Sequence, residues 1–144
     1  MTPQLYEILA IFTSFIILFC AISLFFKYKN SNILVIVLLL SGIFSILMRS
    51  YRLNNNVCGE FCNHPLFYAD VFFAVLTLCI ALAHPICFDL RLPILLAGIL
   101  MVLGAIVPHY NYPITACYLH LGGHVIICFC LLYIILWCKV ADND

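Results

Sequence analysis

Long apolar stretches alternate with short polar stretches along the whole chain. Five apolar stretches are each bounded by a charged residue, a histidine or a proline, and they cover residues 5–26, 33–48, 66–83, 92–107 and 114–137. Each is close to the roughly 17–25 residues that a helix needs to cross the hydrocarbon core of a bilayer. None shows the alternation typical of barrel strands, so the pattern predicts five transmembrane helices.

The composition agrees with this prediction. Hydrophobic residues make up 67% of the 144 positions, and charged residues make up only 8%, against about 25% in a soluble domain. The formal net charge of zero offers no basic surface to a phosphate backbone, which argues against nucleic acid as a partner. We therefore expect an all-α, polytopic transmembrane bundle that forms one domain over residues 1–144.

The distribution of Lys and Arg predicts the orientation of the chain. The first apolar run is too long for the core of a cleavable signal peptide, so we expect it to remain as a span. Positive residues favour the cytoplasmic side of a membrane. One side of the membrane would hold four positive residues, Lys27, Lys29, Arg91 and Lys139, and the other side two, Arg49 and Arg52. This difference favours an outside or lumenal N-terminus and a cytoplasmic C-terminus.

The only long polar loop, residues 51–65, contains Cys58 and Cys62. On an outer or lumenal face these two thiols are candidates for a disulfide that closes the loop. Their C-G-E-F-C spacing differs from the C-x-x-C of thiol oxidoreductases, which makes redox catalysis the less favoured alternative. A zinc site that uses both thiols and His64 is a further alternative, but it lacks a fourth local ligand.

Asp70, His120 and His124 are ionisable side chains inside predicted spans. Such groups are costly in a membrane and mark functional sites. His120 and His124 are four residues apart, so both face one side of a helix and form a potential metal clamp. Two alternatives remain open, namely that the imidazoles hydrogen-bond across the bundle or that one of them binds haem.

Several polar side chains fall at a similar depth when residues are counted from the outer end of each span. A carboxylate, imidazoles and a hydroxyl at one depth are typical of a metal or proton-transfer site. The simpler alternative is that Arg49 neutralises the Asp70 carboxylate without any catalysis. The residues expected to converge are Ser45, Arg49, His64, Asp70, His120 and His124.

Three segments resemble motifs of the CREST superfamily, which includes alkaline ceramidases, adiponectin-receptor-like proteins and myomaker-like proteins. Y-L-H-L-G-G-H-V, which contains His120 and His124, is similar to the motif of the last span in that family. F-Y-A-D-V-F-F-A, with Asp70, is similar to the third-span motif. S-I-L-M-R-S-Y-R, with Ser45 or Ser50, is similar to a degraded form of the second-span motif. The resemblance implies a zinc ion that activates water against a lipid amide or ester.

The chain also departs from that family, because it has room for five spans rather than seven and has arginines where the family has a second-span histidine. The first functional hypothesis is therefore a zinc-dependent intramembrane lipid hydrolase or an inactive relative of one. His120, His124 and His64 would bind zinc, and Asp70 and Ser45 would act on water and on a membrane lipid. The alternatives are a haem- or quinone-associated anchor subunit of a redox complex, and a non-enzymatic scaffold or partner subunit of a membrane assembly.

Overall fold

The computed structural model describes residues 2–27, 32–55, 64–106 and 113–137. Within these ranges all regular structure is helical, which confirms the predicted all-α class. Five of the described helices are long and apolar enough, by length and composition, to cross a membrane. The elements are α1 (Pro3–Lys27), α2 (Asn32–Asn54), α3 (Pro65–Ala83), the short 3-10 helix η1 (Pro85–Leu90), α4 (Arg91–Ile106) and α5 (Pro113–Trp137).

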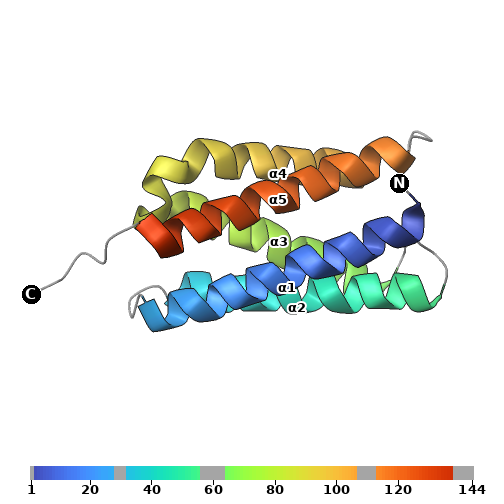
Figure 1. Cartoon of the computed structure of the whole chain (residues 1–144), viewed down its shortest axis with the longest axis horizontal. Coiled ribbons are helices and arrows are strands. Elements are labelled where there is room, and N and C mark those ends of the chain that lie inside the picture. The colour runs from blue at the N-terminus through green and yellow to red at the C-terminus, as the bar shows by residue number, and fades with distance from the viewer. Residues whose placement is uncertain (1, 28–31, 56–63, 107–112, 138–144) are drawn as a thin grey trace, which may run out of the picture.

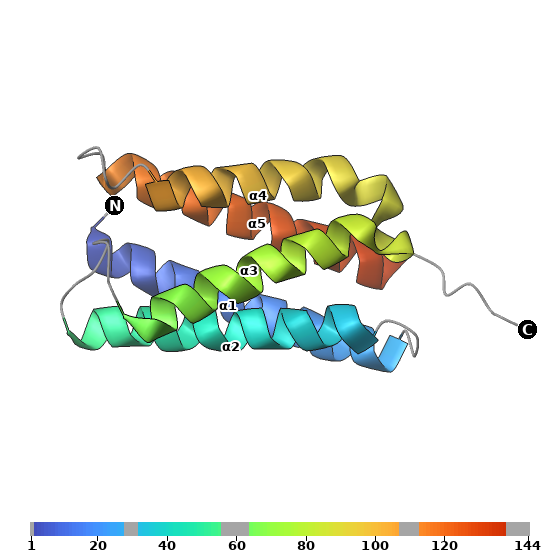
Figure 2. The same cartoon turned by 180° about the vertical axis from the view of Figure 1, so that it is seen from behind.

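The helices form a bundle around one long axis (Figure 1). Helix α1 packs against α2 and α5, and α4 packs against α5. Helix α3 crosses the bundle diagonally, with its first turns over α2 and its last turns near η1 and α4 (Figure 2). The first turn of α1 and the last turn of α5 lie at opposite ends, as an odd number of crossings requires.

Helix α2 is longer than its apolar pattern predicts. The predicted span ends at residue 48, whereas the helix continues through Arg49 and Arg52 to Asn54. The two arginines do not end the helix, because both side chains are buried and paired inside the bundle. The charges that marked a boundary in the sequence therefore belong to the interior of the protein.

Helices α4 and α5 approach each other through small residues. A Cβ atom added at Gly123 would lie 2.7 Å from the Ala97 carbonyl oxygen, and one at Gly104 would lie 2.8 Å from the backbone nitrogen of His120. Only glycine permits backbones to pack this closely, as at small-residue interfaces in membranes. This contact fixes the position of the His120 turn against α4.

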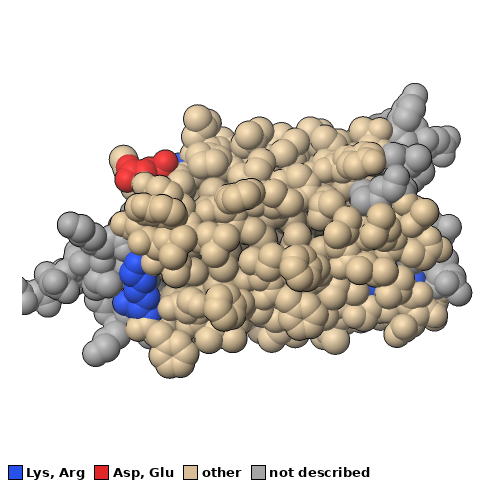
Figure 3. All heavy atoms as spheres, viewed as in Figure 1, with Lys and Arg blue, Asp and Glu red and all other residues tan. Residues whose placement is uncertain are grey.

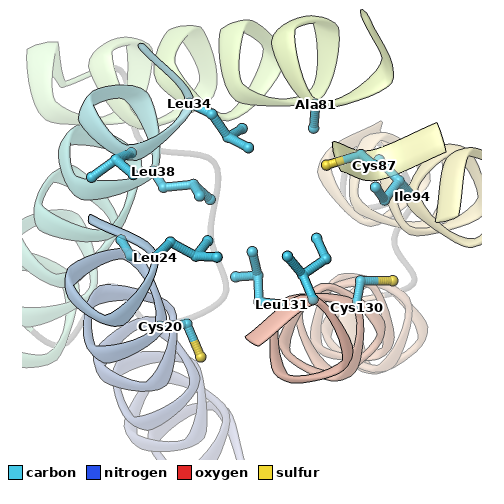
Figure 4. Close-up of a cluster of buried hydrophobic side chains, with 12 residues drawn as sticks. Cys20, Leu24, Leu34, Leu38, Ala81, Cys87, Ile94, Cys130 and Leu131 are labelled. Carbon is cyan, nitrogen blue, oxygen red and sulfur yellow. The ribbon is translucent and has the colours of Figure 1, made fainter. Parts of the chain in front are cut away.

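The main apolar core lies at the end of the bundle where Lys27 ends α1. Every described helix contributes buried side chains to this core, and Leu24, Leu34 and Leu131 point towards one central space (Figure 4). Lys27 directs its ammonium group to the carbonyl oxygens of Ile134 and Ile135 near the end of α5. A cation there interacts favourably with the negative end of the helix dipole.

The outer surface of the spans is apolar. Figure 3 shows Lys, Arg, Asp and Glu atoms only towards the two ends of the face in view, with uncharged residues between them. Phe12, Phe15 and Phe19 on α1 are all more than half exposed. An apolar belt of this kind is the surface that a bilayer covers.

Candidate functional site

A buried ion-pair network joins α1 to α2 near the first turns of α1. The Glu7 side chain is fully buried, and its Oε2 atom accepts a hydrogen bond from Nη1 of Arg49 at 3.2 Å. Nη1 of Arg52 lies 3.6 Å from the other carboxylate oxygen, Oε1. One carboxylate thus holds two guanidinium groups that stand three residues apart on the same helix.

The network extends to α5 through His120. Nη2 of Arg49 lies 2.8 Å from Nε2 of His120. Because a guanidinium group only donates hydrogen bonds, Nε2 is the acceptor and the imidazole is neutral, with its proton on Nδ1. The other side of the ring faces the backbone of Met101 on α4. Both polar sides of the His120 ring are therefore occupied by the protein.

His124 lies one turn deeper and pairs with α1. Its Nδ1 atom is 3.1 Å from the hydroxyl oxygen of Thr13, and the two imidazole rings of His120 and His124 have centroids 4.8 Å apart. The Nε2 atom of His124 makes no hydrogen bond within the described part of the chain. His120 and His124 thus share one face of α5, as their spacing predicts, but they have different partners.

Asp70 and Ser45 complete the polar end of the bundle. Asp70 on α3 interacts electrostatically with Arg49 and Arg52, so two carboxyl groups face two guanidinium groups. The Ser45 side chain lies beside Asp70, yet its buried hydroxyl oxygen makes no hydrogen bond of normal geometry. A buried polar atom without a partner costs about 1–3 kcal/mol, which makes this hydroxyl an unusual feature.

A cavity of about 140 Å³ runs through the bundle below α3. At one end it is lined by four of the residues singled out in the sequence, and at the other by apolar core side chains. The structure therefore brings together Ser45, Asp70, His120 and His124 around one space. That space is apolar over most of its length, because the polar lining is concentrated at this end.

His64 does not line this cavity. Its Nδ1 atom accepts a hydrogen bond from the backbone nitrogen of Leu66 at 3.2 Å, which caps the N-terminus of α3. Its ring stacks on Tyr51 at a centroid distance of 4.2 Å. The candidate disulfide residues Cys58 and Cys62 lie outside the described residues. His84 ends α3 at the opposite end of the bundle, where partial burial lowers its pKa.

The arrangement of donors does not fit a zinc ion. Among the residues that the structure describes, no group of three His, Cys, Asp or Glu side chains is placed to hold a metal. Arg49 donates to the Nε2 atom of His120, the atom that a metal would need, and brings a positive charge to the same place. Zinc binding would require this guanidinium group to leave, with Glu7 then losing a partner.

The two imidazoles are not arranged as a pair of axial ligands to one haem iron either. The two imidazoles stand on adjacent turns of one helix, whereas two axial ligands of one iron approach from opposite faces. The Thr13 hydroxyl lies 3.1 Å from one ring nitrogen of His124, and the His120 nitrogens face Arg49 and Met101. Of the three alternatives for this histidine pair, hydrogen bonding across the bundle is the one that these contacts support.

Glu7 and Thr13 also build this site, although the residues predicted from the sequence do not include them. Glu7 is the only charged residue between residues 5 and 26, and a lone carboxylate in an apolar span is itself a signal of a buried pair. Thr13 gives no such signal, since a threonine in a span often bonds only to its own helix. Its contact with His124 depends on how α1 and α5 pack.

Comparisons of the chain with protein-family models, curated proteins and solved structures give no match.

Proposed function

We propose that this chain is a multi-pass membrane protein that binds a membrane lipid inside its helix bundle. The observation that carries the proposal is the Ser45 hydroxyl, which is buried, lines the cavity and makes no hydrogen bond of normal geometry within the described residues. A ligand atom at this position would give the hydroxyl a hydrogen bond of normal geometry. Apolar walls with a few polar groups at one end are typical of ligand sites.

The proposal is limited to binding. Zinc-dependent hydrolysis, which the sequence resemblance implies, needs a set of ligands that these side chains do not provide, because Arg49 occupies Nε2 of His120. The carboxyl groups of Glu7 and Asp70 are likewise engaged with arginines. These contacts support a preformed polar wall against which a lipid head group lies.

Photo-crosslinking in a bilayer tests this function. The purified protein is placed in nanodiscs with a diazirine-labelled fatty alcohol, fatty acid or phosphatidylcholine, each in turn, and labelled residues are mapped by mass spectrometry. We expect at least one lipid to label cavity residues such as Leu38 and Leu131. Labelling only of outward-facing residues such as Phe12, with all three lipids, would overturn the proposal.

A matched pair of variants identifies the site. Ser45→Leu places an apolar side chain in the cavity and should remove the internal label. Ser23→Leu makes the same change on α1 at a position that does not line the cavity, where the hydroxyl bonds only to the Phe19 carbonyl oxygen. This control should keep the internal label, and equal loss in both variants would argue against a site at Ser45.

A further inference from the structure

The cavity opens sideways, towards the region that lipid occupies. Of the side chains that line it, Val71 and Val75 on α3 and Val102 on α4 are also exposed on the outer surface, at 40%, 47% and 46%. All three lie within spans. The opening between these two helices therefore faces the hydrocarbon core of a bilayer.

The diagonal path of α3 creates this opening. Near its end, α3 contacts α4 closely, because a Cβ added at Gly98 would lie 2.5 Å from Cδ2 of Leu78. Its first turns lie instead over α2, away from α4 (Figure 2). The two helices are thus held together at the apolar end of the cavity and separate towards the polar end.

The cavity is long and narrow. Its wall on α2 extends from Leu34 to Ser45, roughly 17 Å, and its wall on α5 from His120 to Ile134, roughly 21 Å. A volume of about 140 Å³ spread over that length is too narrow for two hydrocarbon chains side by side. The length also matches one leaflet, which is about 15 Å of the ~30 Å hydrocarbon core.

The polar end holds as many carboxyl groups as guanidinium groups. Glu7 and Asp70 carry two carboxyl groups, Arg49 and Arg52 carry two guanidinium groups, and His120 is neutral because it accepts from Arg49. A phosphate or a quaternary amine placed here would add an uncompensated charge in a medium of low dielectric. An uncharged head group avoids that cost.

Two polar atoms in the cavity lining match a hydroxyl group. The Ser45 hydroxyl both donates and accepts, and Nε2 of His124 does one or the other according to its tautomer. A hydroxyl on the ligand satisfies both partners in either tautomer. A quinone carbonyl only accepts, so it matches Nε2 of His124 in only one tautomer.

We infer that the cavity binds a single-chain lipid with an uncharged hydroxyl head, which enters sideways from the bilayer between α3 and α4. This inference rests on the proposed lipid-binding function. The head lies against Ser45 and His124, and the chain extends along the apolar walls towards Leu34 and Ile134. Figure 4 shows the far end of that path, where Leu34, Leu38 and Leu131 surround the central space.

The test is competition for the internal label of diazirine-labelled hexadecanol in nanodiscs. Unlabelled hexadecanol should reduce labelling of Leu38 at least tenfold more effectively than hexadecanoate at pH 8.5, lysophosphatidylcholine or dioleoylglycerol. Equal competition by dioleoylglycerol would overturn the single-chain assignment, and equal competition by the two charged lipids would overturn the uncharged head. Either result would leave the proposed lipid-binding function intact. Absence of any internal label would overturn the proposed function together with this inference.

Two variants separate the entry route and the charge balance. Val75→Trp fills the opening and should slow internal labelling at least tenfold, while Val125→Trp, on an exposed part of α5 that does not line the cavity, should leave it unchanged. Glu7→Gln removes one carboxylate and should move the preference towards hexadecanoate, while Glu7→Asp keeps the charge and should not. Unchanged labelling in Val75→Trp would overturn the sideways route.

Discussion

Nη2 of Arg49 on α2 donates a hydrogen bond to Nε2 of His120 on α5, across a distance of 2.8 Å. The same guanidinium group holds Glu7 on α1 through Nη1. One side chain thus connects three helices, and its geometry determines both the protonation of His120 and the availability of that ring to any metal.

Removing the charge at position 49 should destabilise the bundle strongly. Arg49→Met leaves Glu7 with one partner and His120 without its donor from α2, and breaking a buried pair in this way costs about 3–5 kcal/mol. Arg49→Lys should recover only part of that loss, because an ammonium group cannot reproduce the fork that bonds both partners. Reversible unfolding in mixed detergent micelles measures both changes, and an Arg49→Lys variant as stable as the parent protein would contradict the forked contact.

The double variant Glu7→Gln/Arg49→Met should increase affinity for divalent metal. It frees Nε2 of His120 and removes a positive charge, while the paired change avoids leaving a buried carboxylate alone. We expect Zn²⁺ to bind at least tenfold more tightly than to the parent protein, as measured by equilibrium dialysis with elemental analysis. If the parent already binds one zinc per chain, and loses it in His120→Ala, then Arg49 does not block the site.

The two adjacent glycines of α5 should differ sharply in their tolerance of a methyl group. At Gly123 an added Cβ meets the Ala97 carbonyl oxygen at 2.7 Å, so Gly123→Ala should cost about 1–3 kcal/mol through overpacking. At Gly122 the nearest atom is 3.9 Å away, so Gly122→Ala should be neutral or slightly stabilising. Thermal unfolding of both variants in one detergent compares them, and a similar loss in each would mean that α4 and α5 pack differently.

His64 should behave as a helix cap. His64→Ala removes the acceptor for the Leu66 amide and should destabilise α3 by about 1 kcal/mol, while His64→Asn restores a side-chain acceptor and should recover most of it. Hydrogen exchange of the first turn of α3 gives the local readout. A metal ligand would respond differently, since asparagine would not restore binding.

The five long helices within the described residues could be predicted from sequence because each contains a long apolar run. The extension of α2 beyond residue 48 could not, since Arg49 and Arg52 mark a helix end unless Glu7 is known to face them. The spacing of His120 and His124 correctly placed both rings on one face of α5. It could not reveal that Arg49 and Thr13, on two other helices, would occupy their nitrogens.

The contacts of Ser45 and Asp70 likewise could not be predicted from the sequence. Their depth in the spans indicated that they share one end of the bundle, and both line the cavity there. Whether a hydroxyl at that depth is satisfied depends on atomic positions to within a few tenths of an ångström. No periodicity in the sequence indicates atomic positions with that precision.

The residues of this network are synthesised at different times, which bears on how the chain would enter a membrane. Glu7 leaves the ribosome 42 residues before Arg49 and long before His120, which is a further 71 residues along. A nascent first span therefore presents an unpaired carboxyl group to lipid until the end of the second span emerges. This favours release of α1 and α2 from the insertion machinery as a paired hairpin, with α5 joining last and closing the contact at His120.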